Sequence, residues 1–352
     1  MFDKWFGKTV IYSDRRFAYE DAQEIIEGSV GDYQEEILLL NDLAGKIRDQ
    51  RFANGAVNFE SVEVKFKLDE KGKPLEVIPK ERKEAHKMIE EFMLLANREV
   101  ATFIFDKGKE KQQEGSLPFV FRVHNDPDPE KFDNFSKFAS RFGYQFPTQG
   151  GISKNLNKLF ADIQGKPEQN VLESIALRSM AKARYTTDPI GHFGLSFEHY
   201  THFTSPIRRY PDLMVHRLLW DYLEGKNLQE KELIEEKCIH SSEREKRAVE
   251  AERASIKFKQ VEFMSEMLGE TFDGIVSGIT EWGLFVEIST TKCEGMIRIA
   301  DIEYDQFQYD AKQYRIVGRR TGRVVSLGDE IHVKVLKTDI DRRTIDLLCV
   351  KK

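Results

Sequence analysis

The stretch HYTHFTSPIRRYPDLMVHR, residues 199–217, concentrates side chains that can bind a phosphate group. It contains three histidines, three arginines, three aromatic rings and two prolines. Ser205 followed by Pro206 is a helix-start signal, because a hydroxyl caps free N–H groups and proline fits the first helical position. Apolar side chains then recur three or four residues apart, which predicts a helix with the buried stripe Ile207, Tyr210, Met214, Leu218 and Tyr222.

This helix start would place Arg208 and Arg209 in its first turn. Cations at that end oppose the helix dipole and cost stability unless an anion offsets them. The planar arginine fork grips phosphate through two hydrogen bonds. The alternative is that the arginines pair with an acidic neighbour such as Asp212. The adjacent Tyr200, His202 and Phe203 favour the anion site.

Two other polar stretches lie on predicted helices. EAERASIKFK places Glu252 in a charged helix, and IEEFMLLAN places Glu90 beside a very apolar helix face. Alone, such patterns are typical of solvated or packed helix faces. His199 and His202 have neither an HExxH motif nor a cysteine partner, so they do not predict a zinc site.

The sequence pattern changes near residue 265. Short apolar segments then follow one another: FDGIVSGI, GLFVEI, GMIRIADI, EIHVKVLKTD and TIDLLCV. Five such strands predict a small barrel of the OB type. Trp282 and Phe285 are predicted on one exposed face with Arg298 in the next strand, a platform on which single-stranded bases can stack. The alternative is that Phe285 belongs to the core and only Trp282 is exposed.

The residues before this barrel predict an α+β domain rich in helices. We expect a strand in KTVIYS (8–13), a helix that Gly28 closes, a helix over 32–52 and a hairpin over 56–79. A helix over 81–104 follows, then a loop around Pro127 and Pro129, a helical half to about residue 225 and a charged helix over 228–267. The predicted domains are therefore 1–265 and 266–352.

Composition indicates an ordinary globular protein. The 352 residues are 40% hydrophobic and 32% charged, with a net charge of −6. A nucleic-acid site would have to be a local groove of positive charge. No apolar run is long enough for a membrane helix, and no signal peptide is visible. We therefore expect no membrane partner. The three cysteines are widely spaced, which favours a reducing, cytoplasmic setting.

Long segments over nearly the whole chain carry a family resemblance. They include WFGKTVIYSDRRFAYEDAQEIIE, GAVNFESVEVKFKLDEKGKP, IEEFMLLAN, FVFRVHNDPDPEK and LRSMAKARYTTDPIGHFGLSFEHYTHFTSPIRRYPDL. Together they resemble the RNB family of exoribonucleases, of the ribonuclease R and ribonuclease II type. GETFDGIVSGITEWGLFVE, with the later EGMIRIADI, resembles the S1-type RNA-binding domain of these enzymes. The resemblance implies part of an RNB catalytic domain, a mixed sheet with helices, followed by a five-stranded S1 barrel.

The resemblance also implies an activity. The family degrades single-stranded RNA processively from its 3′ end and releases nucleoside 5′-monophosphates, with a magnesium pair that stabilises the attacking and leaving oxygens. By resemblance, Arg208 stabilises charge on the scissile phosphate and Glu252 acts near the leaving nucleotide. The implied RNA-binding residues are Tyr19, Phe59, Glu90, Arg209, Trp282, Phe285 and Arg298.

The metal ligands of the family pattern are a run of aspartates of the DxxDxDD kind. The nearest aspartate-rich stretch here, HNDPDPEKFDNF, matches a different family segment. Magnesium needs well-placed carboxylates. We therefore expect a fragment that retains the RNA channel and needs the missing N-terminal portion of the same enzyme for activity. The alternative is a non-catalytic RNA-binding protein that reuses the RNB and S1 folds. We also expect the sheet beginning at Lys8 to expose an unpaired edge.

Overall fold

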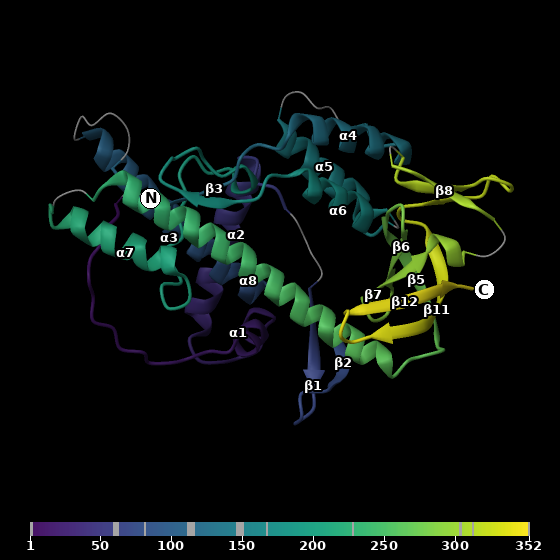
Figure 1. Cartoon of the computed structure of the whole chain (residues 1–352). Coiled ribbons are helices and arrows are strands. Elements are labelled where there is room, and N and C mark those ends of the chain that lie inside the picture. Colours follow the sequence, from purple (N-terminus) through teal and green to yellow (C-terminus); the bar gives the residue numbers. More distant parts are fainter. Residues whose placement is uncertain are drawn as a thin grey trace.

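The structure is a computed structural model of the whole chain. It describes residues 3–58, 63–80, 82–110, 117–145, 151–166, 168–226, 229–302, 305–311 and 313–350. Figure 1 shows a body rich in helices on one side, a small β-barrel on the other, and one long helix, α8, that runs between them. None of the described helices is both long enough and apolar enough to cross a membrane.

Three helices from the first third of the chain pack together. They are α1 (Tyr19–Ile26), α2 (Gln34–Ala53) and α3 (Glu84–Glu110). The residue that follows α1 is Glu27, and Gly28 then adopts a φ of 111°, which explains the predicted glycine stop. Between α2 and α3 lies the predicted hairpin, with β1 (Glu63–Leu68) antiparallel to β2 (Pro74–Lys80), and Figure 1 shows it projecting from the body.

A first hydrophobic core lies where α3 meets a small sheet and two later helices. The sheet is β3 (Phe121–Val123) antiparallel to β4 (Arg184–Thr186), and the helices are α7 (Tyr210–Leu223) and the start of α8 (Lys231–Ser265). Its buried members include Val100, Ile104, Phe119, Phe121, Val215, Leu218, Tyr222 and Ile234. This core supports the loop that leads into α7.

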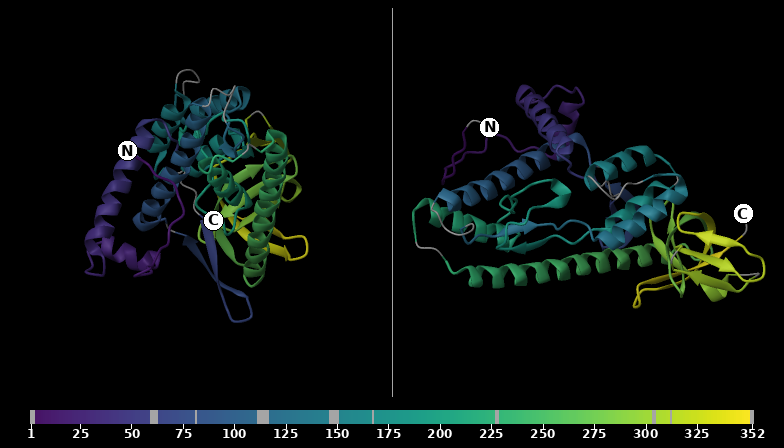
Figure 2. Two further views of the ribbon diagram at one scale, coloured as in Figure 1. Left: turned by 90° about the vertical axis from the view of Figure 1, so that its left-hand side faces the viewer. Right: turned by 90° about the horizontal axis from the view of Figure 1, so that it is seen from above.

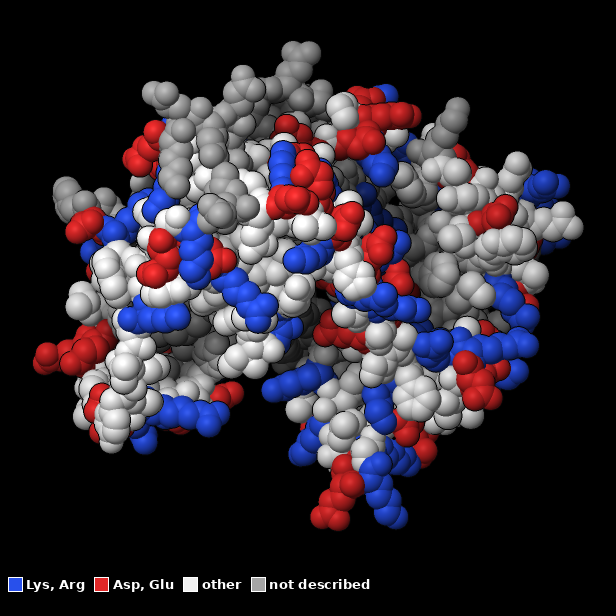
Figure 3. Space-filling model, turned by 60° about the vertical axis from the view of Figure 1, so that its left-hand side comes forward, with Lys and Arg blue, Asp and Glu red and all other residues white. Residues whose placement is uncertain are grey.

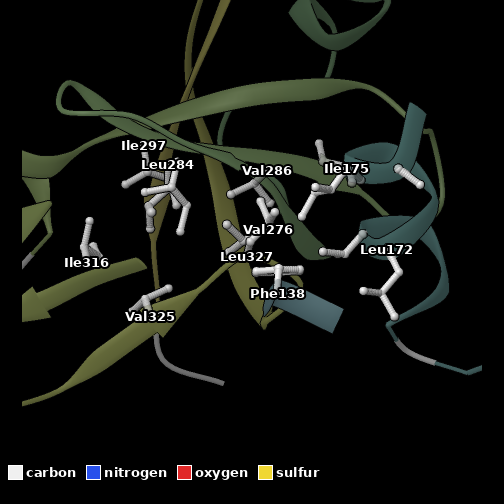
Figure 4. Packing of buried hydrophobic residues seen from close by; sticks show 14 of the residues in the cluster. Phe138, Leu172, Ile175, Val276, Leu284, Val286, Ile297, Ile316, Val325 and Leu327 are labelled. Atoms are coloured by element: carbon white, nitrogen blue, oxygen red, sulfur yellow. The ribbon is translucent and has the colours of Figure 1, made fainter. Parts of the chain in front are cut away.

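A second hydrophobic core joins the barrel to the body. The body contributes α4 (Pro129–Ala139), the short helices η1 (Ser140–Phe142) and η2 (Phe193–Leu195), α5 (Ile152–Ile163) and α6 (Gln169–Ser179). Figure 4 shows Phe138, Leu172 and Ile175 against barrel residues such as Val276 and Leu327. The barrel is therefore packed on the body and shares its core.

The barrel is closed in the strand order β11-β12-β7-β6-β5. Its strands are β5 (Thr271–Ile279), β6 (Gly283–Ile288), β7 (Glu294–Arg298), β11 (Glu330–Asp339) and β12 (Thr344–Cys349). This confirms the predicted five-stranded barrel. Between β7 and β11 the chain adds the short helix η3 (Ile299–Asp301) and a separate sheet of β8 (Phe307–Asp310), β9 (Arg315–Gly318) and β10 (Val324–Ser326), which the sequence did not predict.

Helix α8 spans the molecule, as the right-hand view of Figure 2 shows. Its 35 residues correspond to a length of about 50 Å. Ile234 and Cys238 near its start belong to the first core, whereas Val261 and Met264 near its end belong to the second. One helix thus ties both cores together and fixes the barrel relative to the body.

Two local predictions are wrong. KTVIYS is an irregular segment: Val10, Ile11 and Tyr12 are 101%, 85% and 87% exposed, and the described residues supply no neighbouring strand for it. The expected sheet edge at Lys8 therefore does not exist here, because a strand needs a partner for its N–H and C=O groups.

The helix predicted from Ser205 begins at Tyr210 instead. Residues 206–208 form a turn, and Ile207 and Tyr210, which are 102% and 51% exposed, are not part of a buried stripe. The second proline, Pro211, occupies the first helical turn, where no N–H is needed. The loop predicted around Pro127 and Pro129 is also shorter than expected. The Asp128 carboxylate accepts from the N–H groups of Glu130 and Lys131, so it caps α4.

Candidate nucleic-acid interface

The turn before α7 is fixed by one buried carboxylate. Asp212 is 0% exposed, and its Oδ1 accepts hydrogen bonds from the Ser205 backbone N–H at 2.7 Å and from Arg209 Nη2 at 2.8 Å. The N–H groups of Arg208 and Arg209 both donate to the Ser205 carbonyl. The turn is therefore closed by its own backbone and held from inside the protein by Asp212.

The two arginines differ in their surroundings. Arg209 precedes the first residue of α7 and pairs with Asp212, which is the predicted alternative to an anion site. Arg208 is exposed and forms no ion pair or hydrogen bond through its side chain with the described residues. Both precede the helix instead of lying in its first turn. The side chain that remains free to meet an anion is Arg208.

Tyr19, Glu90 and Arg209 line one pocket of about 220 Å³, although they are far apart in sequence. Tyr19 belongs to α1, Glu90 to α3 and Arg209 to the turn before α7. The Tyr19 ring stacks on His86, with ring centroids 4.1 Å apart and planes at 12°. Tyr19 is 44% exposed, so a second flat ring can reach it. Glu90 forms an ion pair with Arg82.

Asn97 connects α3 to the loop that carries the arginines. Its Nδ2 donates to the Tyr200 hydroxyl at 3.0 Å, and its Oδ1 accepts from the Phe203 backbone N–H at 2.8 Å. Asn97 is buried, as is Glu91, which pairs with Arg51. The polar residues of IEEFMLLAN thus have different tasks: Glu90 and Asn97 line the pocket, while Glu91 and Asn97 also hold elements together. The sequence marked this motif but did not separate these tasks.

Four buried polar atoms in or beside this pocket have unmet hydrogen-bonding capacity. His86 Nδ1, Thr204 Oγ1, Arg209 Nε and Asp212 Oδ2 find no partner among the described parts of the chain. Buried polar atoms are normally satisfied by protein, water or ligand. Because this set contains a donor, an acceptor and a hydroxyl, the pocket fits a ligand that carries both donors and acceptors, such as a sugar-phosphate.

The rings beside the arginines are electrically neutral. Burial lowers the pKa of His202 to about 2, and the charges of Arg209 and Arg122 act in the same direction. Burial likewise raises the pKa of Tyr185 to about 12, and its hydroxyl lies 2.8 Å from His202 Nδ1. His202 therefore helps to shape the site but adds no positive charge. The cations at this place are the arginines.

The barrel carries a second exposed group of the predicted residues. Gly283 pairs with Arg298 and Phe285 with Met296 across β6 and β7, so Phe285 and Arg298 lie on the same outer face. Phe285 is half-buried, whereas its neighbours Leu284 and Val286 form the core. Trp282 is 72% exposed in the turn before β6. The structure brings the three residues to one end of the barrel, but Arg298 is paired with Asp301 at 2.7 Å.

Figure 3 shows one face of the molecule, where Lys and Arg side chains alternate with Asp and Glu around a deep notch. No single sign of charge covers this face. This agrees with the net charge of −6 and with positive charge confined to local positions.

Comparison with known proteins identifies the two parts of the chain. The family model of the RNB domain matches residues 1–225, and that of the S1 RNA binding domain matches residues 266–349. The chain belongs to the RNB family.

Curated relatives of this RNB chain are ribonucleases R. Ribonuclease R 1 of Lactococcus lactis is 38% identical over 346 residues, which cover 95% of this chain and 41% of that protein. Ribonuclease R of Thermotoga maritima is 39% identical over 358 residues, which cover 98% of this chain and 49% of that protein. The chain thus spans less than half the length of these relatives.

Solved structures show the same arrangement. The structure of Mycoplasma genitalium RNase R in complex with ribose methylated single-stranded RNA matches with a TM-score of 0.87 and 26% identity, over 95% of this chain and 53% of that one. Yeast Ssd1, described as a pseudonuclease, matches in fold with a TM-score of 0.63 and 20% identity, over 85% of this chain and 37% of that one.

Glu252, predicted to act near the leaving nucleotide, does not line the pocket. Glu252 is exposed on α8 and forms no ion pair or hydrogen bond through its side chain with the other described residues; it lies two helical turns, about 10 Å, beyond Glu245, which pairs with Arg122. Phe59 lies outside the described residues.

RNB ribonucleases are generally metal-dependent. Within the described ranges, no three His, Cys, Asp or Glu side chains come together as a group that could hold a metal ion. Glu90 is the single acidic residue among the described residues that line the pocket, and one of its oxygens pairs with Arg82. The described residues therefore do not fit a resident metal.

Proposed function

We propose that this chain is the C-terminal part of a cytoplasmic 3′-to-5′ exoribonuclease that acts processively on single-stranded RNA and releases nucleoside 5′-monophosphates. The observation that supports this most is the pocket that joins Tyr19, Glu90 and Arg209 beside the free Arg208. These residues come from three separate elements, and buried polar atoms beside them still need partners. Such a pocket is suited to one nucleotide at the end of a strand.

In this proposal each side chain has a task that follows from its surroundings. A terminal base stacks on the open face of Tyr19, whose other face is supported by His86. Glu90 accepts hydrogen bonds from ribose hydroxyls. Arg209 Nε donates to the backbone next to the terminal nucleotide, and the free Arg208 fork binds the scissile phosphate and stabilises the charge that develops there.

The remaining assignments follow the same proposal. Phe59 stacks on a terminal base and Glu252 acts near the leaving nucleotide. Trp282, Phe285 and Arg298 hold the strand at the barrel by base stacking and charge. The domains are proposed as residues 1–265 and 266–352, because α8 ends at Ser265 and its first half packs in the body.

Magnesium would supply charge stabilisation of the attacking and leaving oxygens. We propose that its carboxylate ligands come from the missing N-terminal portion of the same enzyme. This chain's own residues would then bind the 3′ end, orient it and hold the scissile phosphate. The proposal leaves residues 1–352 able to bind RNA but unable to cut it alone.

The test is to incubate the purified chain with 5′-labelled single-stranded RNA and magnesium, and to measure both binding and hydrolysis. We expect binding that Arg208→Ala weakens, without release of nucleotides. Release of nucleoside 5′-monophosphates by the wild-type chain, lost in Arg208→Ala, would contradict the proposal that the magnesium ligands come from outside this chain. Binding that Arg208→Ala does not change would contradict the assignment of the site.

The alternative, a non-catalytic RNA-binding protein, differs in one outcome. A polypeptide carrying the part of Thermotoga maritima ribonuclease R that this chain does not span is added to the assay. Restored trimming supports the nuclease, whereas binding without trimming supports the alternative.

A further inference from the structure

The turn GRRTGR, residues 318–323, is the tip of the extra sheet that separates β7 from β11. It joins β9 to β10 and carries Arg319, Arg320 and Arg323, all exposed. Figure 1 shows the sheet containing β8 beside the barrel, with one end next to α4 of the helical body. Neither the family resemblance nor the sequence pattern assigned this turn a task.

The turn is rigidly built around Asp305. The Asp305 carboxylate accepts hydrogen bonds from the Thr321 hydroxyl and from the backbone N–H groups of Arg320 at 2.9 Å, Thr321 at 2.7 Å and Gln306 at 2.7 Å. The Thr321 hydroxyl and these backbone donors hold the pKa of Asp305 far below its usual range. A Cβ at Gly318 would come within 2.3 Å of Asp305 Oδ2, so glycine is required there.

Two of the arginine side chains in this turn are free. Arg319 and Arg323 form no side-chain ion pair or hydrogen bond with another residue in the described ranges. By contrast, Arg298 is tied to Asp301 at 2.7 Å and Arg315 to Asp310 at 3.2 Å. The turn therefore supplies positive charge that no carboxylate of the described residues pairs with, in addition to the paired Arg298.

The turn and the aromatic platform belong to the same end of the barrel. The Ile299 N–H, at the start of the connection from β7 to the extra sheet, donates to the Trp282 carbonyl at 3.1 Å. Glu281, next to Trp282, is close enough to Tyr309 on β8 to contribute to its raised pKa, after burial and Tyr314. A strand whose bases stack on Trp282 can therefore continue toward the extra sheet.

We propose that Arg319 and Arg323 form a phosphate-binding site for the backbone of the RNA strand that stacks on the barrel. This rests on the proposed function, because it names a further contact for the same substrate. Arginine suits the task since its planar fork matches phosphate oxygens. Because Asp305 already fixes the backbone of the turn, binding costs less conformational entropy. In a chain of net charge −6, two free arginines on one rigid tip are a local anion site.

The size of the effect follows from counterion release. Each phosphate contact with a single strand contributes about 0.7 to the slope of log K against log salt. At about 0.1 M salt, one contact then corresponds to a roughly five-fold change in affinity and two contacts to roughly 25-fold. Removing both arginines should also lower the salt slope by about 1.4.

The experiment measures fluorescence anisotropy of a labelled single-stranded RNA with the full chain in EDTA, over a series of salt concentrations. The variants are Arg319→Ala/Arg323→Ala and, as a control matched in charge, Lys334→Ala/Lys337→Ala. Both lysines are exposed on β11, which is not a neighbour of β6 or β7 in the barrel. Arg319→Lys/Arg323→Lys keeps the charge but removes the forks. The same measurements are repeated with a labelled duplex RNA.

The expected result is a loss of roughly 25-fold and a smaller salt slope for the arginine variant, and near wild-type binding for the lysine control. The inference is overturned if the arginine variant binds like its control. If Trp282→Ala still weakens binding in that case, the proposed function stands and this site alone is wrong. If the wild-type chain binds neither probe, both fail. A loss confined to the duplex probe would also contradict the single-strand site.

Discussion

Asp212 is the residue whose removal should disturb the candidate site most. It is fully buried, and one of its oxygens accepts from both the Ser205 N–H and Arg209. Asp212→Ala leaves the half-buried Arg209 guanidinium and a buried N–H without this partner. Breaking a buried pair from one side costs about 3–5 kcal/mol. Asp212→Asn keeps a neutral acceptor of the same size, so its cost should be smaller, about 1–2 kcal/mol.

The assay is thermal unfolding of the full chain together with RNA binding. Asp221→Ala is the matched control, because Asp221 is on the same helix and pairs with Lys226 at 2.8 Å, with side chains 27% and 55% exposed. An exposed pair of this kind contributes at most about 1 kcal/mol. We expect Asp212→Ala to lower the melting temperature by several degrees more than Asp221→Ala, and to weaken RNA binding through the displaced Arg208. Equal melting temperatures of the two variants would refute the conclusion that Asp212 holds the turn before α7.

Two other predictions concern stability. Burial lowers the pKa of His192 to about 3 and of His202 to about 2, from an ordinary value of 6.5. As pH falls, the two histidines become protonated in the unfolded state before they do in the folded state. The stability that comes from burying them in neutral form is therefore full above pH 6.5 and is lost as pH falls toward 3. Melting at pH 5.5 against pH 7.5 should show a loss of order 2–3 kcal/mol for the two histidines, and a flat profile would contradict their burial. Leu172→Ala, at the seam between α6 and the barrel, should cost about 2–5 kcal/mol and lower the barrel's stability with that of the body. Unchanged melting of the barrel, followed by Trp282 fluorescence, would contradict the shared core.

The regular elements could be predicted from sequence because their signals are local. Alternating apolar residues indicated β5, β6, β7, β11 and β12, and the charged run over 228–267 indicated α8. KTVIYS carries the same strand signal as the barrel, yet the described part of the chain places no strand beside it. A strand depends on its neighbour as well as on its own residues. The extra sheet was missed because glycines and charged residues dilute its short apolar runs.

Three residues that line the candidate pocket were named from the sequence, but the geometry of the pocket was not. Family resemblance named Tyr19, Glu90 and Arg209, and the structure places them in one pocket. In the sequence Asp212 follows Arg209 by three residues, so an ion pair between them was possible. Whether this pair forms depends on where the helix starts, and the helix starts later than predicted. No periodicity relates Asn97 to Tyr200 and Phe203, because that link joins segments about one hundred residues apart.

The central claim is that the pocket of Tyr19, Glu90 and Arg209 receives the 3′ end of an RNA strand. The most direct test places the fluorescent base 2-aminopurine at the 3′ end or at the 5′ end of a single-stranded RNA bound to the chain in EDTA. Stacking on Tyr19 should quench the 3′ probe and leave the 5′ probe bright, and Tyr19→Ala should remove this difference. Equal quenching at both ends, or 3′ quenching that survives Tyr19→Ala, would contradict the account.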